Sequence, residues 1–313
     1  MLSVGLMKGN SIKSNEIRFD VYGQNNVNGY FTTSVSQTIT VTYRDGITVS
    51  YTGSGNVYIY RVDGVINGTV KVVFEKPDKI TGWFLIRLSN AFPDLSILTN
   101  ITGISLEIFN NISFDSPYLM AIQTRLTGFT CQRGPDISLA TVQNFMKGLN
   151  VSNLYFGLLF GTHNRISYDA FLPHLADTLK SFTVRHFYGS LIPDCTSLVN
   201  LTSLDFVEFA RVVDGGLDGN SVDYLPNSNK LKGVNCLNCN MTNTNVNLFI
   251  DKIYAWANTN ANNSVNLNIG GNNAAASGTY DGTTDWSGGL PTSPKAKLWH
   301  LVNSRSWTIT FTA

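Results

Sequence analysis

The sequence of 313 residues predicts an α/β solenoid, in which a curved parallel sheet follows a small antiparallel β-sandwich-like domain. Two observations lead to this prediction. A pattern of apolar positions recurs through the middle of the chain, and the segment before it alternates apolar and polar residues. We therefore expect three parts: a β-sandwich-like module over 1–76, a solenoid over 77–271 and a capping segment over 272–313.

The N-terminal module is predicted from its alternation. The stretch "TITVTYRDGITVSYTGSGNVYIYRVDG" places apolar and polar residues in turn, with "RDG" between two runs and "GSGN" at the end of the second. A period of two is typical of strands with one buried face, and Asp-Gly is a common hairpin turn. The module is therefore expected to consist of antiparallel strands.

The solenoid is predicted from a repeat. Counting from its first apolar residue, each copy has apolar residues or cysteine at offsets zero, three and five, and all but one at offset eight. A short strand over offsets two to six would point offsets three and five into a core, which a single copy cannot close. Copies should therefore stack as parallel strands. They begin at Ile80, Ile101, Leu126, Val151, Leu179, Leu201 and Leu231, and a shortened strand is expected at 265–271.

These copies, such as "ITGISLEIF" and "LTSLDFVEF", resemble the leucine-rich repeat, whose pattern is L-x-x-L-x-L-x-x-N/C-x-L with a period of roughly 20–29 residues. The order "ITVTYRDGITVSYTGSG" and "GTVKVVF", followed by the repeats, resembles the polycystic-kidney-disease-like β-modules that precede leucine-rich repeats in surface proteins of Bacteroidota and their phages. The resemblance implies a leucine-rich-repeat surface or virion protein.

The spacers between strands predict helices over 135–150, 167–179 and 242–260, since apolar residues recur there at helical spacing, and the convex side is expected to mix helix with irregular turn. After the repeats, a short helix is expected around Lys295–Val302, and then a last strand in "SWTITFTA". This C-terminal unit would cover the open end of the solenoid.

Composition excludes some partners. The chain has 22 Lys and Arg against 21 Asp and Glu, and it lacks a basic tract, so we expect no nucleic-acid partner. No apolar run approaches the roughly 20 residues that span a bilayer, and the start lacks a signal-peptide pattern, so neither membrane insertion nor secretion by that route is expected. Charged residues make up 14%, and Asn, Thr, Ser, Gly and Tyr replace them, as in binding loops.

No catalytic motif is found: the sequence has no nucleophile elbow, phosphate-binding loop, His-Glu-x-x-His pair or dinucleotide-binding fingerprint. The pair Cys236 and Cys239, in "CLNC", could be a redox motif or half a zinc site, but it falls on offsets five and eight, where cysteine serves as a small core residue. We expect no enzyme activity, no cofactor and no bound metal.

The candidate binding site lies on the concave face, at offsets two, four and six. We expect Leu204 and Phe206 to be buried and Asp205 to point outward beside its neighbours. A patch of polar groups with an aromatic ring would suit a glycan or a protein loop, although loops or a neighbouring subunit could cover this face instead. The proposed contact residues are Gln132, Tyr155, Thr183, Arg185 and Asp205.

These observations favour a non-enzymatic structural or recognition component of a bacteriophage virion, such as a spike, fibre or receptor-binding subunit. Its partners would be other virion proteins, further copies of itself, and a glycan or protein on the host surface. A bacterial cell-surface leucine-rich-repeat adhesin is the alternative. A glycosidase would need two carboxylates about 5–9.5 Å apart in a cleft, and the repeat offers no such pair.

Overall fold

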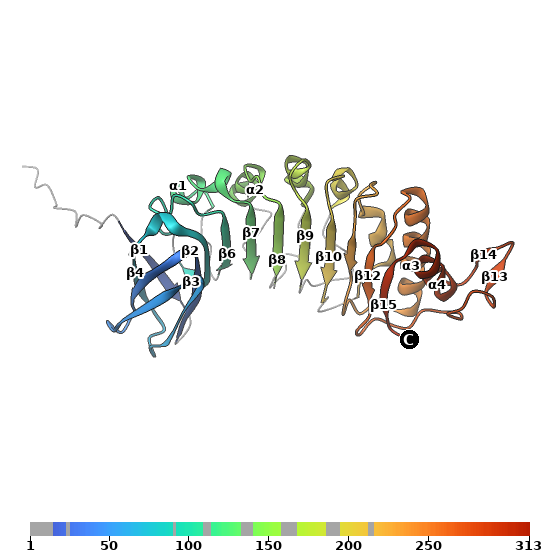
Figure 1. The fold of residues 1–313 in the computed structure, drawn as a ribbon, viewed down its shortest axis with the longest axis horizontal. Coiled ribbons are helices and arrows are strands. Elements are labelled where there is room, and N and C mark those ends of the chain that lie inside the picture. The colour runs from blue at the N-terminus through green and yellow to red at the C-terminus, as the bar shows by residue number, and fades with distance from the viewer. Residues whose placement is uncertain are drawn as a thin grey trace, which may run out of the picture.

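A large, mostly parallel sheet runs through the computed structural model (Figure 1). The structure describes residues 15–22, 26–89, 92–108, 114–132, 140–157, 168–185, 195–211 and 216–313. Within them, a 13-stranded sheet has the order β15-β12-β11-β10-β9-β8-β7-β6-β5-β1-β4-β2-β3. The protein is therefore a mixed α/β protein, which confirms the predicted class at that level.

The N-terminal strands pair antiparallel, as their alternation predicts. The long strand β2 changes partners at a bulge between Thr33 and Gln37, so its first half pairs with β5 and its second half with β4. Alternate residues of β2, such as Phe31, Ile39 and Val41, are fully buried. The strands of this unit are β1 (Glu16–Tyr22), β2 (Asn26–Thr42), β3 (Thr48–Val62) and β4 (Asn67–Phe74).

The strand β5 (Ile80–Ser89) joins the antiparallel unit to the rest of the sheet. It pairs antiparallel with β1 and β2, and parallel with β6. Its Trp83 is buried, with its ring 6.3 Å from that of Phe31 in a parallel stack. One continuous hydrophobic cluster extends from Ile17 to Trp307. The predicted boundary between 76 and 77 therefore lies between strands of one sheet and one core.

The parallel strands follow one another in chain order, and Figure 1 shows them side by side with the β13–β14 hairpin protruding at the far end. The predicted shortened strand and the predicted last strand are both present, as β12 and β15. The strands are β6 (Gly103–Ile108), β7 (Gly128–Gln132), β8 (Asn153–Gly157), β9 (Ser181–Arg185), β10 (Phe206–Ala210), β11 (Gly233–Asn235), β12 (Asn266–Ile269) and β15 (Thr308–Phe311), with the hairpin of β13 (Trp286–Ser287) and β14 (Leu290–Pro291).

Helices and 3-10 turns make the connections. Two predicted helices are confirmed in the spacers, although 135–139 lies outside the described residues. The third, over 167–179, is wrong: the chain forms two 3-10 turns there, because Pro173 lacks an N–H and disfavours helical geometry before it. The helices are α1 (Pro117–Met120), α2 (Ala140–Lys147), α3 (Asn243–Thr259) and α4 (Pro294–Arg305); the turns are η1 (Pro77–Lys79), η2 (Gln123–Arg125), η3 (Tyr168–Ala170), η4 (Leu172–Leu175), η5 (Thr196–Asn200) and η6 (Gly219–Tyr224).

A repeated hydrogen-bond pattern at offset one fixes how consecutive strands align. The carbonyl oxygen of Ser152 accepts the N–H groups of Lys180 and Ser181, at 2.8 and 2.9 Å. The carbonyl of Lys180 in turn accepts those of Asp205 and Phe206, at 2.8 and 3.1 Å. Because the same arrangement recurs from repeat to repeat, residues at one offset lie side by side across the sheet. The acceptors that bind two N–H groups in this way are Thr102, Thr127, Ser152, Lys180 and Asp205.

This pattern corrects the register of the copy "LTSLDFVEF". Asp205 occupies offset one, so the copy begins at Leu204 rather than at Leu201. Val207 is therefore the fully buried strand residue, and the predicted burial of Phe206 is wrong. The ring of Phe206 lies on the other face, where a Cβ on Gly233 would approach it to 2.5 Å. Two registers fit the same apolar pattern here. Counted from Leu201, the offsets zero, three, five and eight also fall on apolar residues, namely Leu201, Leu204, Phe206 and Phe209.

We predict that truncating the two phenylalanines of β10 has unequal costs. Phe209→Ala should lower the free energy of unfolding by roughly 3–5 kcal/mol, because it leaves a cavity in the core. Phe206→Ala should cost about 1 kcal/mol, because its ring is partly exposed on the outer face. Urea denaturation measures both free energies of unfolding. A larger loss of stability for Phe206→Ala than for Phe209→Ala would support the sequence-based register instead.

Candidate functional site

One row of outward-pointing side chains crosses the sheet. Strand pairing aligns offset four of each parallel strand with its neighbours, about 4.8 Å apart. The row continues through β5 and β2 to β3, because Phe84 pairs with Tyr30 and Tyr30 with Tyr58. We call it the outer row. Its members are Tyr58, Tyr30, Phe84, Ser105, Thr130, Tyr155, Thr183, Glu208, Asn235, Asn268 and Thr310.

Three of the five predicted contact residues come together at the middle of this row. Tyr155 pairs with Thr183 across β8 and β9, and Arg185 lies two residues further along β9. The Arg185 guanidinium carbon stands 5.6 Å from the centre of the Tyr155 ring, in a cation–π arrangement. The same ring lies over Gly157, where a Cβ would come within 2.7 Å of it. Tyr155 is therefore held flat against its own strand and beside a charged neighbour.

Glu208 is the residue that sequence reasoning missed. It points outward beside Thr183, and its two carboxylate oxygens accept hydrogen bonds from Arg185 Nε and Nη2 at 2.5 and 2.8 Å. Its side chain is 3% exposed, whereas that of Arg185 is 36% exposed. These hydrogen bonds raise the pKa of the Arg185 guanidinium. The corrected register would have identified Glu208, because it then falls on offset four.

The other two predicted contact residues are Asp205 and Gln132. Asp205 is exposed, but it precedes β10 on the turn, and its main chain takes part in the offset-one hydrogen bonds. Its predicted place on the outer row is wrong, for the same reason as the register: Glu208 stands there instead. Gln132 lies in β7, where it pairs with Gly157, and its side chain is outside the described part of the structure.

The arrangement presents an oriented guanidinium rather than a free carboxylate. Glu208 is engaged at both oxygens by Arg185, so the pair presents a nearly neutral surface in which the guanidinium is oriented and the tyrosine ring is partly accessible. Tyr155 adds a hydroxyl group that both donates and accepts hydrogen bonds, whereas Thr183 beside it is buried. Such a surface can hold a polar, uncharged group against an aromatic ring.

The cysteines are core residues, as their offsets predict. Cys236 and Cys239 are 1% and 0% exposed, and the Cys239 thiol donates to the Phe209 carbonyl at 2.9 Å. Burial raises the pKa of the Cys131 and Cys236 thiols. Among the described residues, no cluster of three or more His, Cys, Asp or Glu has the geometry of a metal site. In the same residues, no helix combines the length and apolarity that a membrane span requires.

Comparison of the chain with protein-family models, with characterised proteins and with solved structures finds no significant match.

We predict that Arg185→Met destabilises the fold by roughly 1–3 kcal/mol at neutral pH, because it leaves the buried Glu208 carboxylate without its partner. Lys79→Met is the control: it removes one side of an exposed ion pair and should change stability by less than about 1 kcal/mol. Urea denaturation at neutral pH measures both values, and equal losses in the two variants would contradict the pairing.

Proposed function

We propose that the parallel part of the sheet is a leucine-rich-repeat-like solenoid with a concave outer face. Each repeat contributes one short strand, and from β6 onward the described connection to the next strand contains a helix or 3-10 turn, so no repeat closes its own core. The recurring hydrogen bonds at offset one support this proposal, because they give successive repeats the same relation to each other. The antiparallel unit and the C-terminal segment cover the two ends.

The function that this geometry supports best is recognition without catalysis, by a structural or receptor-binding component of a bacteriophage virion. The outer row is the observation on which the proposal depends. Between Ser105 and Thr310 it consists of hydroxyl, amide and aromatic side chains, and its single carboxylate, Glu208, is paired with Arg185. A nearly neutral row of hydrogen-bonding groups suits a host-surface glycan or an uncharged protein loop, and other virion proteins or further copies would hold the chain in the particle.

A bacterial cell-surface adhesin with the same repeat is the second candidate, because the outer row would serve either protein. The two differ in where the chain is found. Mass spectrometry of purified particles of the encoding virus should detect the chain if it is a virion component. Detection in the cell envelope of uninfected bacteria, together with its absence from particles, would support the adhesin and contradict the virion proposal.

We predict that Tyr155→Ala weakens binding of the purified protein to host cells at least tenfold, because it removes the ring at the centre of the row. The melting temperature should change by no more than a few degrees, since the ring is partly exposed. Flow cytometry with the labelled protein measures the binding. Asp205→Ala is the matched control, because Asp205 is exposed and near but lies off the row; equal binding by both variants would show that the middle of the row is not the contact surface.

A further inference from the structure

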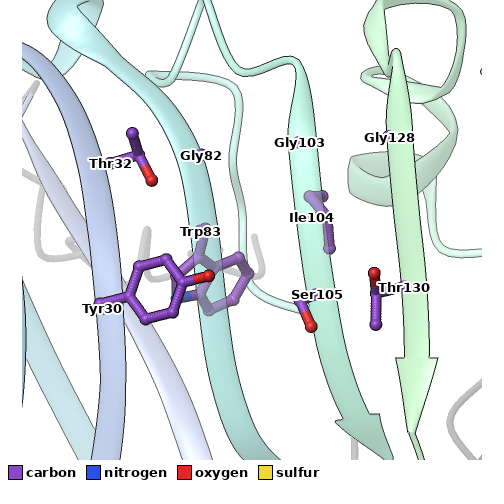
Figure 2. A pocket seen from close by; sticks show the side chains of 9 residues that line it. All are labelled: Tyr30, Thr32, Gly82, Trp83, Gly103, Ile104, Ser105, Gly128 and Thr130. Carbon is purple, nitrogen blue, oxygen red and sulfur yellow. The ribbon is translucent and has the colours of Figure 1, made fainter. Parts of the chain in front are cut away.

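A shallow pocket lies at the N-terminal end of the outer row, where the antiparallel unit meets the first parallel strands. Its volume is about 200 Å³. This is smaller than the ~300 Å³ at which pockets for drug-sized ligands begin, so it would hold one small ring. Figure 2 shows β2, β5, β6 and β7 side by side around it. The lining residues are Tyr30, Thr32, Gly82, Trp83, Gly103, Ile104, Ser105, Gly128 and Thr130.

The Tyr30 ring forms one wall of the pocket. It stacks on Phe84, with centres 5.0 Å apart and planes 8° apart, and it contacts Tyr58 at 5.2 Å. Tyr58 is 63% exposed and lies on β3, on the side of Tyr30 away from the pocket, so it supports the Tyr30 ring without lining the pocket. Figure 2 shows the Tyr30 ring lying across β5, with its hydroxyl directed toward the middle of the pocket. The wall therefore offers both an apolar surface and a hydrogen-bonding group.

Hydroxyl groups surround the rest of the pocket. Thr32, Ser105 and Thr130 contribute three side-chain hydroxyls, and Thr32 donates to the Asn56 side chain at 2.8 Å. None of the lining residues carries a charge. Single-stranded nucleic acid also stacks on aromatic rings, but it requires a positively charged groove. The charge of this pocket instead matches a neutral ligand with many hydroxyl groups.

Three glycines form the floor, at offset two of successive strands. A Cβ on Gly103 or Gly128 would meet no atom within 4 Å, and neither glycine has a positive φ. Neither packing nor backbone conformation therefore requires glycine there, although glycine weakens a strand. Bare backbone in a strand is typical of places where a ligand approaches closely.

From this combination we propose that the pocket is a subsite for one neutral sugar ring of an oligosaccharide. The apolar face of the sugar packs on the Tyr30 ring, and its hydroxyls bond to Thr32, Ser105, Thr130 and the exposed backbone of the glycine floor. The inference rests on the proposed function, because both assign recognition to the outer face, but it places the neutral-sugar contact on β2, β5, β6 and β7, whereas Tyr155 lies on the next strand, β8.

The test uses an array of neutral and acidic glycans with the whole chain, followed by calorimetry with the best neutral oligosaccharide. Gly103→Thr should weaken its binding at least tenfold, because the new side chain enters the pocket from a Cβ position that meets no atom within 4 Å, and the melting temperature should stay the same or rise. Tyr30→Ala should also weaken it at least tenfold, because it removes the ring that lines the pocket. Tyr280→Ala is the matched control: Tyr280 is 40% exposed and contacts Phe311 at 5.3 Å at the opposite end of the sheet.

Two outcomes would overturn the subsite. Binding to acidic glycans alone, or to no glycan, contradicts a neutral-sugar pocket. Binding of the neutral oligosaccharide that is lost in Tyr155→Ala but unchanged in Gly103→Thr and Tyr30→Ala also contradicts it, while leaving the proposed recognition function intact. Loss in Gly103→Thr and Tyr30→Ala with unchanged binding by Tyr280→Ala supports it.

Discussion

The hydrogen bonds at offset one are the interaction on which the rest of the structure depends. In each, a carbonyl at the start of one strand accepts two N–H groups from the start of the next, as Lys180 does for Asp205 and Phe206. This leaves no freedom to shift a strand by one residue, and a shift of one would turn every side chain to the other face. The core, with Val207 and Phe209, and the outer row, with Glu208, both follow from it.

The outer row changes its chemistry along its length. Aromatic rings occupy its N-terminal end at Tyr58 and Tyr30, the Arg185–Glu208 pair lies near its middle, and amides follow at Asn235 and Asn268. A ligand that extends across several strands would therefore meet different groups at each strand spacing. Under the proposed recognition function, such a ligand would be a polymer whose units meet successive strands about 4.8 Å apart.

Much of the fold could be predicted from the sequence, because the burial of one face of each strand makes apolar residues recur at a regular spacing. Alternation identified the antiparallel unit, and the repeat identified the parallel strands and the burial of Cys236 and Cys239. The sequence failed where two registers satisfy the same apolar pattern, as in "LTSLDFVEFA", and where Pro173 outweighs helical periodicity. The Arg185–Glu208 pair and the contacts of the Tyr30 ring with Tyr58 and Phe84 depend on which strands become neighbours, and apolar periodicity carries no information about that.

Disulfide trapping tests the in-register row most directly. The structure pairs Ser181 with Phe206, whereas the sequence-based register would place Ser181 beside Ser203. Paired strands bring Cα atoms within the 4.4–6.8 Å range that a disulfide spans. Under mild oxidation of the folded protein, Ser181→Cys with Phe206→Cys should form a cross-link, whereas Ser181→Cys with Ser203→Cys should stay reduced, as the buried natural cysteines do. Cross-linking of the Ser203 pair in place of the Phe206 pair would contradict the register and, with it, the outer row.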